Sequence, residues 1–132
     1  MKNYLLDTHV LLWYLYDSDK LSEIVANILI NEKNVYVSAV SFWEFSLKYA
    51  LGKLDLKSIN PTELFKFCEK FDFKIISLTA NESASLWELD ATYHKDPFDR
   101  MLIWQSIQNN FTLLSNDKNM DAYCSEGLVL LW

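Results

Sequence analysis

The sequence contains few of the residues that interrupt regular structure or cross-link a chain. Its 132 residues include only 2 glycines, 2 prolines and 2 cysteines. So little glycine and proline argues against a loop-rich all-β fold and favours short connections between regular elements. Cys68 and Cys124 show no motif spacing, which favours a reduced, cytoplasmic protein and leaves a single disulfide open as the alternative.

Long apolar runs and zinc-type ligand patterns are also missing. The longest apolar run, residues 10–16, is far too short to span a bilayer, so we expect no membrane segment. Asp7 interrupts the apolar start of the chain, so no signal peptide is predicted. The two histidines, His9 and His94, lie far apart, and the only arginine is Arg100.

Apolar and acidic residues are plentiful. Hydrophobic residues make up 51% of the chain and aromatic residues 15%, which predicts one compact domain over residues 1–132. The formal net charge of -6 disfavours binding of nucleic acid through a basic surface. This objection weakens where acids gather around a cation, because a bound metal reverses the local sign of charge.

Strands and helices are predicted to alternate along the chain. Short β-branched and aromatic runs predict strands at 3–6, 35–37, 73–76, 112–114 and 128–131. Helical spacing and capping residues predict helices at 8–16, 21–31, 61–70, 80–93 and 98–109, and another that begins at Ser38 or Ser41 and ends near 51. This alternation predicts a mostly parallel sheet that helices cover on both faces.

Four acidic residues are candidates for one site: Asp7, Glu44, Asp99 and Asp117. Three of the four fall at or near a strand end or helix start on one predicted edge of the sheet, and Glu44 lies in the first or second turn of its predicted helix. Parallel sheets bind their ligands at this edge, beyond the carboxyl ends of the strands. Carboxylates brought together repel one another unless a cation neutralises them, and Mg²⁺ or Mn²⁺ suits such oxygen ligands. The arrangement therefore favours metal-assisted hydrolysis of a phosphodiester.

Each of these acids also has a purely structural explanation. These are an N-cap for Asp7, a capping box for Ser41 and Glu44, the first helical turn for Asp99, and a turn for Asp117. Local capping does not explain why four acids should gather at one end of one sheet. The conjunction therefore favours a functional site.

Four segments carry a resemblance to a known family. Residues 4–9 (YLLDTH), 41–44 (SFWE), 96–100 (DPFDR) and 114–117 (LSND) resemble the motifs of PIN-domain proteins, in the same order along essentially the whole chain. Residues 51–56 (LGKLDL) and the final Leu131-Trp132 narrow the resemblance to VapC-type toxins. The resemblance implies a three-layer α/β/α sandwich with a central, mostly parallel sheet. It also implies an Mg²⁺- or Mn²⁺-dependent endoribonuclease that a cognate antitoxin neutralises. Proteins of this kind usually form homodimers, so a homodimer is expected here.

The resemblance also assigns roles by motif position. It implies a catalytic quartet of Asp7, Glu44, Asp99 and Asp117. We expect Asp7, Asp99 and Asp117 to bind the metal, while Glu44 helps to hold it or orients the attacking water. Three neighbouring side chains are expected to support the acids: Thr8, Asp96 and Ser115. The Ser115 hydroxyl is expected to orient Asp7 or Asp117.

Two basic residues are candidate contacts to the RNA substrate. Arg100 lies in the first turn of its helix, where a phosphate contact or a salt bridge to the acids would explain a cation, and a plain surface arginine is the alternative. Lys48 lies four residues after Glu44, so it is expected either to pair with Glu44 or to meet the RNA backbone.

Two other functions remain open from the residues alone. One is a phosphatase with Asp7 as an aspartyl nucleophile, although His9 stands where such enzymes usually place a second acid. The other is a non-catalytic protein-binding module, in which the acids cap helices and the aromatic helix 8–16 docks a partner.

Overall fold

Five short strands and their connecting helices make up the described part of the chain. The computed structural model describes residues 2–90 and 96–132. The strands are β1 (Asn3–Leu6), β2 (Val35–Ser38), β3 (Lys74–Ile76), β4 (Phe111–Leu114) and β5 (Val129–Leu131). The α-helices are α1 (Thr8–Tyr16), α2 (Glu23–Asn31), α3 (Ala39–Ala50), α4 (Pro61–Lys70), α5 (Ala80–Ser85) and α6 (Pro97–Asn109). Three 3₁₀ segments complete them: η1 (Ser18–Lys20), η2 (Leu86–Glu88) and η3 (Lys118–Glu126).

The strands form one parallel sheet in the order β3-β2-β1-β4-β5. Leu5 in the central strand β1 pairs with Tyr36 in β2 and with Leu113 in β4. Because every strand runs in the same direction, the carboxyl ends of all five lie at one edge. The predicted parallel α/β fold is therefore confirmed.

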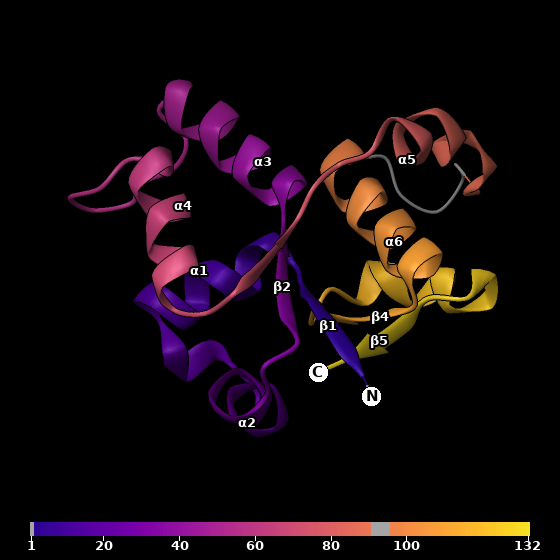
Figure 1. Ribbon diagram of the computed structural model, residues 1–132, viewed down its shortest axis with the longest axis horizontal. Helices are drawn as coiled ribbons and strands as arrows, with labels where there is room; N and C mark the ends of the chain where they lie inside the picture. Colours follow the sequence, from indigo (N-terminus) through magenta and orange to yellow (C-terminus); the bar gives the residue numbers. More distant parts are fainter. Residues whose placement is uncertain (1, 91–95) are drawn as a thin grey trace.

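Side chains alternate between two hydrophobic cores, one on each face of the sheet. Tyr4 and Leu6 belong to the core beneath α1, α2, α3 and α4, whereas Leu5 belongs to the core with α6, η2 and η3. Figure 1 shows the same division, with α1 to α4 on one side of β1 and β2 and with α5 and α6 on the other. The three-layer arrangement follows from this alternation, since β1 is buried on both faces.

Most predicted elements are present, with one clear error. The helix predicted over 80–93 ends at Ser85, continues as the 3₁₀ turn η2, and is extended at Leu89. Its predicted last residues, 91–93, lie outside the described part of the chain. The long 3₁₀ segment η3 was not predicted.

The start of α3 settles one capping alternative. Ser38 is the N-cap, and its hydroxyl oxygen accepts a hydrogen bond from the Val40 N–H at 3.0 Å. Ser41 therefore lies inside the helix, and the Ser41–Glu44 capping box is wrong. The Glu44 carboxylate must have another role.

Cys68 and Cys124 are both free thiols, as expected for a reduced protein. Within residues 2–90 and 96–132, every helix is too short or too polar to cross a lipid bilayer.

Candidate active site

Asp7 lies at the junction between β1 and α1, at the carboxyl edge of the sheet. It occupies the N-cap position of α1, but its side chain makes no capping hydrogen bond. The residue is only 4% exposed, and within the described chain its Oδ1 atom has no hydrogen-bond partner. Burial raises the pKa of the Asp7 carboxyl group, and the nearby charge of Asp117 adds to this effect. Capping therefore does not explain this buried carboxylate.

The Ser115 hydroxyl joins Asp7 to Asp117. It donates a hydrogen bond to Asp7 Oδ2 at 2.7 Å and accepts one from the Asp117 N–H at 3.1 Å. Ser115 follows β4, whose last carbonyl, on Leu114, accepts a hydrogen bond from the Asp7 N–H at 3.0 Å. Adjacent parallel strands thus place the two acids side by side.

Glu44 is buried in the second turn of α3. Its side chain is 3% exposed, and its Oε2 atom is paired with the Lys48 ammonium group one turn further along the helix. Its other oxygen, Oε1, has no hydrogen-bond partner in the part of the chain that is described. Lys48 thus makes the pair with Glu44 that its spacing predicted.

Asp96 and Asp99 lie at the start of α6, beside the same lysine. Asp96 is the N-cap of this helix, and its carboxylate accepts hydrogen bonds from the N–H groups of Phe98 and Asp99 at 2.9 and 3.0 Å. Burial acts to lower the pKa of Lys48, but the hydrogen bond and the charge of Glu44 outweigh it. The charges of Asp96 and Asp99 add to this, so the pKa of Lys48 is raised.

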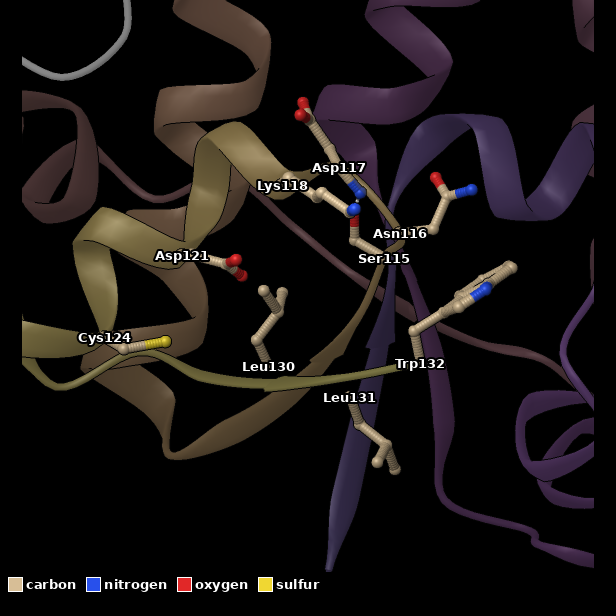
Figure 2. A pocket seen from close by; sticks show the side chains of 9 residues that line it. All are labelled: Ser115, Asn116, Asp117, Lys118, Asp121, Cys124, Leu130, Leu131 and Trp132. Atoms are coloured by element: carbon tan, nitrogen blue, oxygen red, sulfur yellow. Dashed lines mark hydrogen bonds between the residues drawn. The ribbon is translucent and has the colours of Figure 1, made fainter.

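Asp117 caps η3 and borders a cavity. Its carboxylate accepts a hydrogen bond from the Asn119 N–H at 2.9 Å, so the structure gives it a capping role as well. A cavity of about 520 Å³ opens beside Ser115 and Asp117. Figure 2 shows Asp121 and Trp132 on opposite sides of Leu130 in this cavity. The acidic edge therefore continues into a recess of mixed polarity.

The structure brings the predicted acids to one edge of the sheet as two groups. Asp7 and Asp117 share Ser115, whereas Glu44 is paired with Lys48, which also lies in the field of the Asp96 and Asp99 charges. Among residues 2–90 and 96–132, no three His, Cys, Asp or Glu side chains form a group that could hold a metal ion as they stand.

The donor chemistry nevertheless fits a hard divalent cation. Asp7 Oδ1 and Glu44 Oε1 are buried carboxylate oxygens that lack a hydrogen-bond donor among the described residues. A buried carboxylate charge is strongly unfavourable unless a cation compensates it or the group takes up a proton. Oxygen ligands of this kind are those that Mg²⁺ and Mn²⁺ prefer.

Two further contacts in this region were not predicted from the sequence. Arg100 donates hydrogen bonds to the carbonyl oxygens of Asp90 and Leu89, at 2.8 and 3.2 Å, and to the Tyr123 hydroxyl at 3.3 Å. The hydroxyls of Thr8 and Ser41 are 2.9 Å apart and connect α1 to α3. Both contacts join different segments of the chain, so no local sequence pattern predicts them. A contact between Arg100 and RNA stays a prediction.

Comparison with known proteins gives the class of protein. The PIN domain family matches residues 4–126, and the chain belongs to this family. It is distantly similar to Ribonuclease VapC22 of Mycobacterium tuberculosis, with 21% identity over 132 residues that span the full length of both chains.

Solved structures show the same fold at low identity. The VapBC2 complex of Rickettsia felis, bound to a DNA fragment from its promoter, contains a chain that is 20% identical, with a TM-score of 0.70 over 97% of this chain and 96% of that one. DNA-bound VapBC of Salmonella typhimurium gives 15% identity and a TM-score of 0.70 over 99% and 98%. FitAcB of Neisseria gonorrhoeae is 19% identical, with a TM-score of 0.66 over 98% of this chain and 96% of that one.

Proposed function

We propose that this protein is a metal-dependent endoribonuclease and the toxin of a toxin–antitoxin pair. The observation that carries the proposal is the pair of buried carboxylate oxygens, Asp7 Oδ1 and Glu44 Oε1, without hydrogen-bond donors among the described residues at the carboxyl edge of the sheet. Membership of the PIN-domain family and the distant similarity to a VapC ribonuclease support it.

The proposed roles follow the positions of the acids. Asp7, Asp99 and Asp117 hold the divalent ion, and Glu44 helps to hold it or orients the attacking water. Mg²⁺ or Mn²⁺, when bound, polarises the water and stabilises the charge that develops on the RNA phosphate. Ser115 holds Asp7 and Asp117 in place, Asp96 fixes the first turn of α6, and Thr8 ties α1 to α3.

A cleavage assay tests the activity. Purified wild-type protein is incubated with end-labelled RNA in the presence of Mn²⁺, beside Asp7→Asn and the matched control Asp19→Asn, which alters an exposed acid in η1. We expect cleavage by wild type and by Asp19→Asn, and a loss of at least about 100-fold in Asp7→Asn. Equal cleavage by all three proteins would contradict the proposal.

One observation favours a second candidate, the non-catalytic binding module. The two groups of acids do not form a ready metal site among the described residues. Thermal melting during titration with Mn²⁺ separates the candidates, because a ligand at about 100 times its Kd stabilises the native state by about 2.7 kcal/mol. An unchanged melting temperature at millimolar Mn²⁺ would favour the binding module.

A cognate antitoxin is the proposed protein partner. The support is that the similar solved structures are of VapBC and FitAB assemblies. This chain also offers an apolar cavity of about 260 Å³ whose lining includes Leu15, Tyr16, Leu56 and Phe71. An apolar antitoxin segment would bury these side chains. We expect co-purification with the product of a neighbouring small reading frame.

A homodimer in the cytoplasm completes the proposal. Trp43, Leu47 and Leu51 follow one another at intervals of four residues in and just after α3, and each is more than 40% exposed. An exposed apolar row of this kind is typical of an interface between subunits. Light scattering during size-exclusion chromatography measures the expected dimer mass.

A further inference from the structure

One close charge contact in the acidic edge lies within α3. Glu44 and Lys48 lie four residues apart, and the Lys48 Nζ atom donates a hydrogen bond to Glu44 Oε2. The Glu44 side chain is 3% exposed, whereas that of Lys48 is 39% exposed. The carboxylate is therefore fixed inside the protein, and the ammonium reaches it from the surface.

This ion pair differs from an ordinary surface pair between helix residues. An exposed i,i+4 pair contributes little, because water solvates both partners when they separate. The Glu44 carboxylate cannot turn to solvent, and its Oε1 atom already lacks a donor among the residues described. Removal of the ammonium would leave a buried charge uncompensated, which is strongly destabilising.

Lys48 also lies within the field of the neighbouring acids. The charges of Asp96 and Asp99 act on it from the start of α6, in addition to that of Glu44. The helices α3 and α6 are packed together here through Trp43 and Phe98, whose ring centroids are 4.9 Å apart. The positive charge of Lys48 thus lies among carboxylates. The proposed function assigns these carboxylates to the site of a divalent cation.

We propose that Lys48 is an internal counter-ion that competes with the divalent metal for Glu44. Two cations repel each other at short distance, and the repulsion is strong where the surroundings exclude water. Binding of the metal therefore separates Lys48 from Glu44 and turns the ammonium outwards, where it is available to an RNA phosphate. Lys48 lowers the metal affinity of the site and keeps the fold stable when the metal is absent. The inference rests on the proposed function.

Metal affinity measured without RNA tests this role. Mn²⁺ binding is followed by electron paramagnetic resonance and calorimetry for wild type, Lys48→Met, Lys48→Arg and the control Lys57→Met. Lys57 pairs with Asp55 at 3.8 Å, and both side chains are exposed. We expect Lys48→Met to bind Mn²⁺ about tenfold more tightly than wild type, because the competing charge is gone. Lys48→Arg retains the charge, so it and Lys57→Met should remain within about twofold of wild type.

A second measurement needs no variant and covers a failure of Lys48→Met to fold. The Nζ and Cε resonances of labelled lysines are followed in wild-type protein during titration with Mg²⁺. The Lys48 signals should shift and lose their protection from solvent exchange, while those of Lys57 should not change. Mg²⁺ binding without any change in the Lys48 signals would overturn the inference.

The remaining outcomes separate this inference from the proposed function. Equal Mn²⁺ affinity in wild type and Lys48→Met, with RNA cleavage retained by wild type, would overturn the counter-ion role alone. Failure of both proteins to bind Mn²⁺ would overturn that role together with the metal-dependent activity. Tighter Mn²⁺ binding by Lys48→Met, together with wild-type affinity in Lys48→Arg, would support both the counter-ion role and the metal-dependent activity.

Discussion

The Asp7 carboxylate is buried, but its two oxygens differ in their hydrogen bonding. Ser115 donates to one of its oxygens, and the other has no hydrogen-bond partner in the described chain. Groups that serve ligands often have such unfavourable surroundings, because the function and not the stability of the fold selects them. The residue can therefore be tested through stability, independently of any activity.

Asp7→Asn is expected to stabilise the protein at neutral pH in the presence of EDTA. Burial raises the pKa of Asp7 in the folded protein, so the unfolded chain gives up this proton at a lower pH. The folded state then holds more protons between the two pKa values, and the free energy of unfolding falls as pH rises through that window. Removing the charge should recover about 1 kcal/mol, which corresponds to a melting temperature higher by about 3–5 °C.

Calorimetry from about pH 4 to pH 8 checks this expectation. The difference between Asp7→Asn and wild type should grow with pH and shrink towards the acidic end, where the Asp7 side chain of the unfolded chain also begins to take up its proton. Asp19→Asn, which alters an exposed acid, should show no such trend. A variant less stable than wild type at pH 8 would mean that the Asp7 charge is compensated in solution.

Ser115→Ala should have the opposite effect. The substitution removes the donor to Asp7 Oδ2 and the acceptor for the Asp117 N–H, both in buried or half-buried positions. A loss of about 1–3 kcal/mol in the free energy of unfolding is expected from the unsatisfied groups. Urea denaturation measures it, and Ser115→Thr, which retains a hydroxyl, should recover most of the loss. A loss in Ser115→Thr as large as in Ser115→Ala would show that the hydroxyl is not the stabilising group.

At the scale of the secondary-structure elements, the N-cap residue of α3 both caps its helix and links it to a second helix. The Ser38 hydroxyl accepts from the Val40 N–H and donates to the buried Gln105 Oε1 atom at 2.5 Å. Ser38 therefore caps α3 and also connects it to α6.

Ser38→Ala is expected to lower the free energy of unfolding by about 2–3 kcal/mol, because it removes a cap and leaves a buried amide oxygen unsatisfied. Ser22→Ala is the matched control, since Ser22 caps α2 through one hydrogen bond to the Val25 N–H at 3.1 Å. It should lose only about 1 kcal/mol. Equal losses in urea denaturation would argue against a stabilising link between Ser38 and Gln105.

The sequence was informative where local chemistry decides the structure and uninformative where distant contacts do. The β-branched strands and the Asp96-Pro97 start of α6 are local signals, and they were predicted. The helix over 80–93 was predicted from its spacing, yet Arg100 binds the carbonyl oxygens of Leu89 and Asp90 and holds the chain out of a helix there. The strand order likewise depends on long-range pairing, which no single segment encodes.

The candidate site shows the same division. Placement of Asp7, Glu44, Asp99 and Asp117 at one edge could be anticipated from their positions after strands and at helix starts. The two side-chain contacts at this edge, from Ser115 to Asp7 and from Lys48 to Glu44, were also expected from the sequence. How the acids divide between these two contacts was not predicted, because it depends on long-range packing.

For the whole molecule, the net charge of -6 and the acidic edge both oppose the approach of an anionic substrate. A polyanion such as RNA is repelled by such a protein unless positive charge is added at the site. One divalent ion together with a released Lys48 would supply that charge locally. The proposed activity therefore requires the metal for the approach of substrate as well as for chemistry.

The stability of the whole fold can be followed through its two thiols. Cys124 is exposed, whereas Cys68 lies in α4 inside the larger core and is 1% exposed. Burial raises the pKa of the Cys68 thiol to about 12, so it is almost entirely protonated at pH 8. A thiol-specific reagent should modify Cys124 within seconds and Cys68 only when the core opens.

The urea dependence of Cys68 labelling tells which opening is responsible. In Cys124→Ser, the single remaining thiol should react at a rate that rises with urea as steeply as global unfolding does, because α4 packs on the central sheet. A rate that does not depend on urea would mean that α4 detaches by itself. The core on that face of the sheet would then be less cooperative than its packing around Cys68 implies.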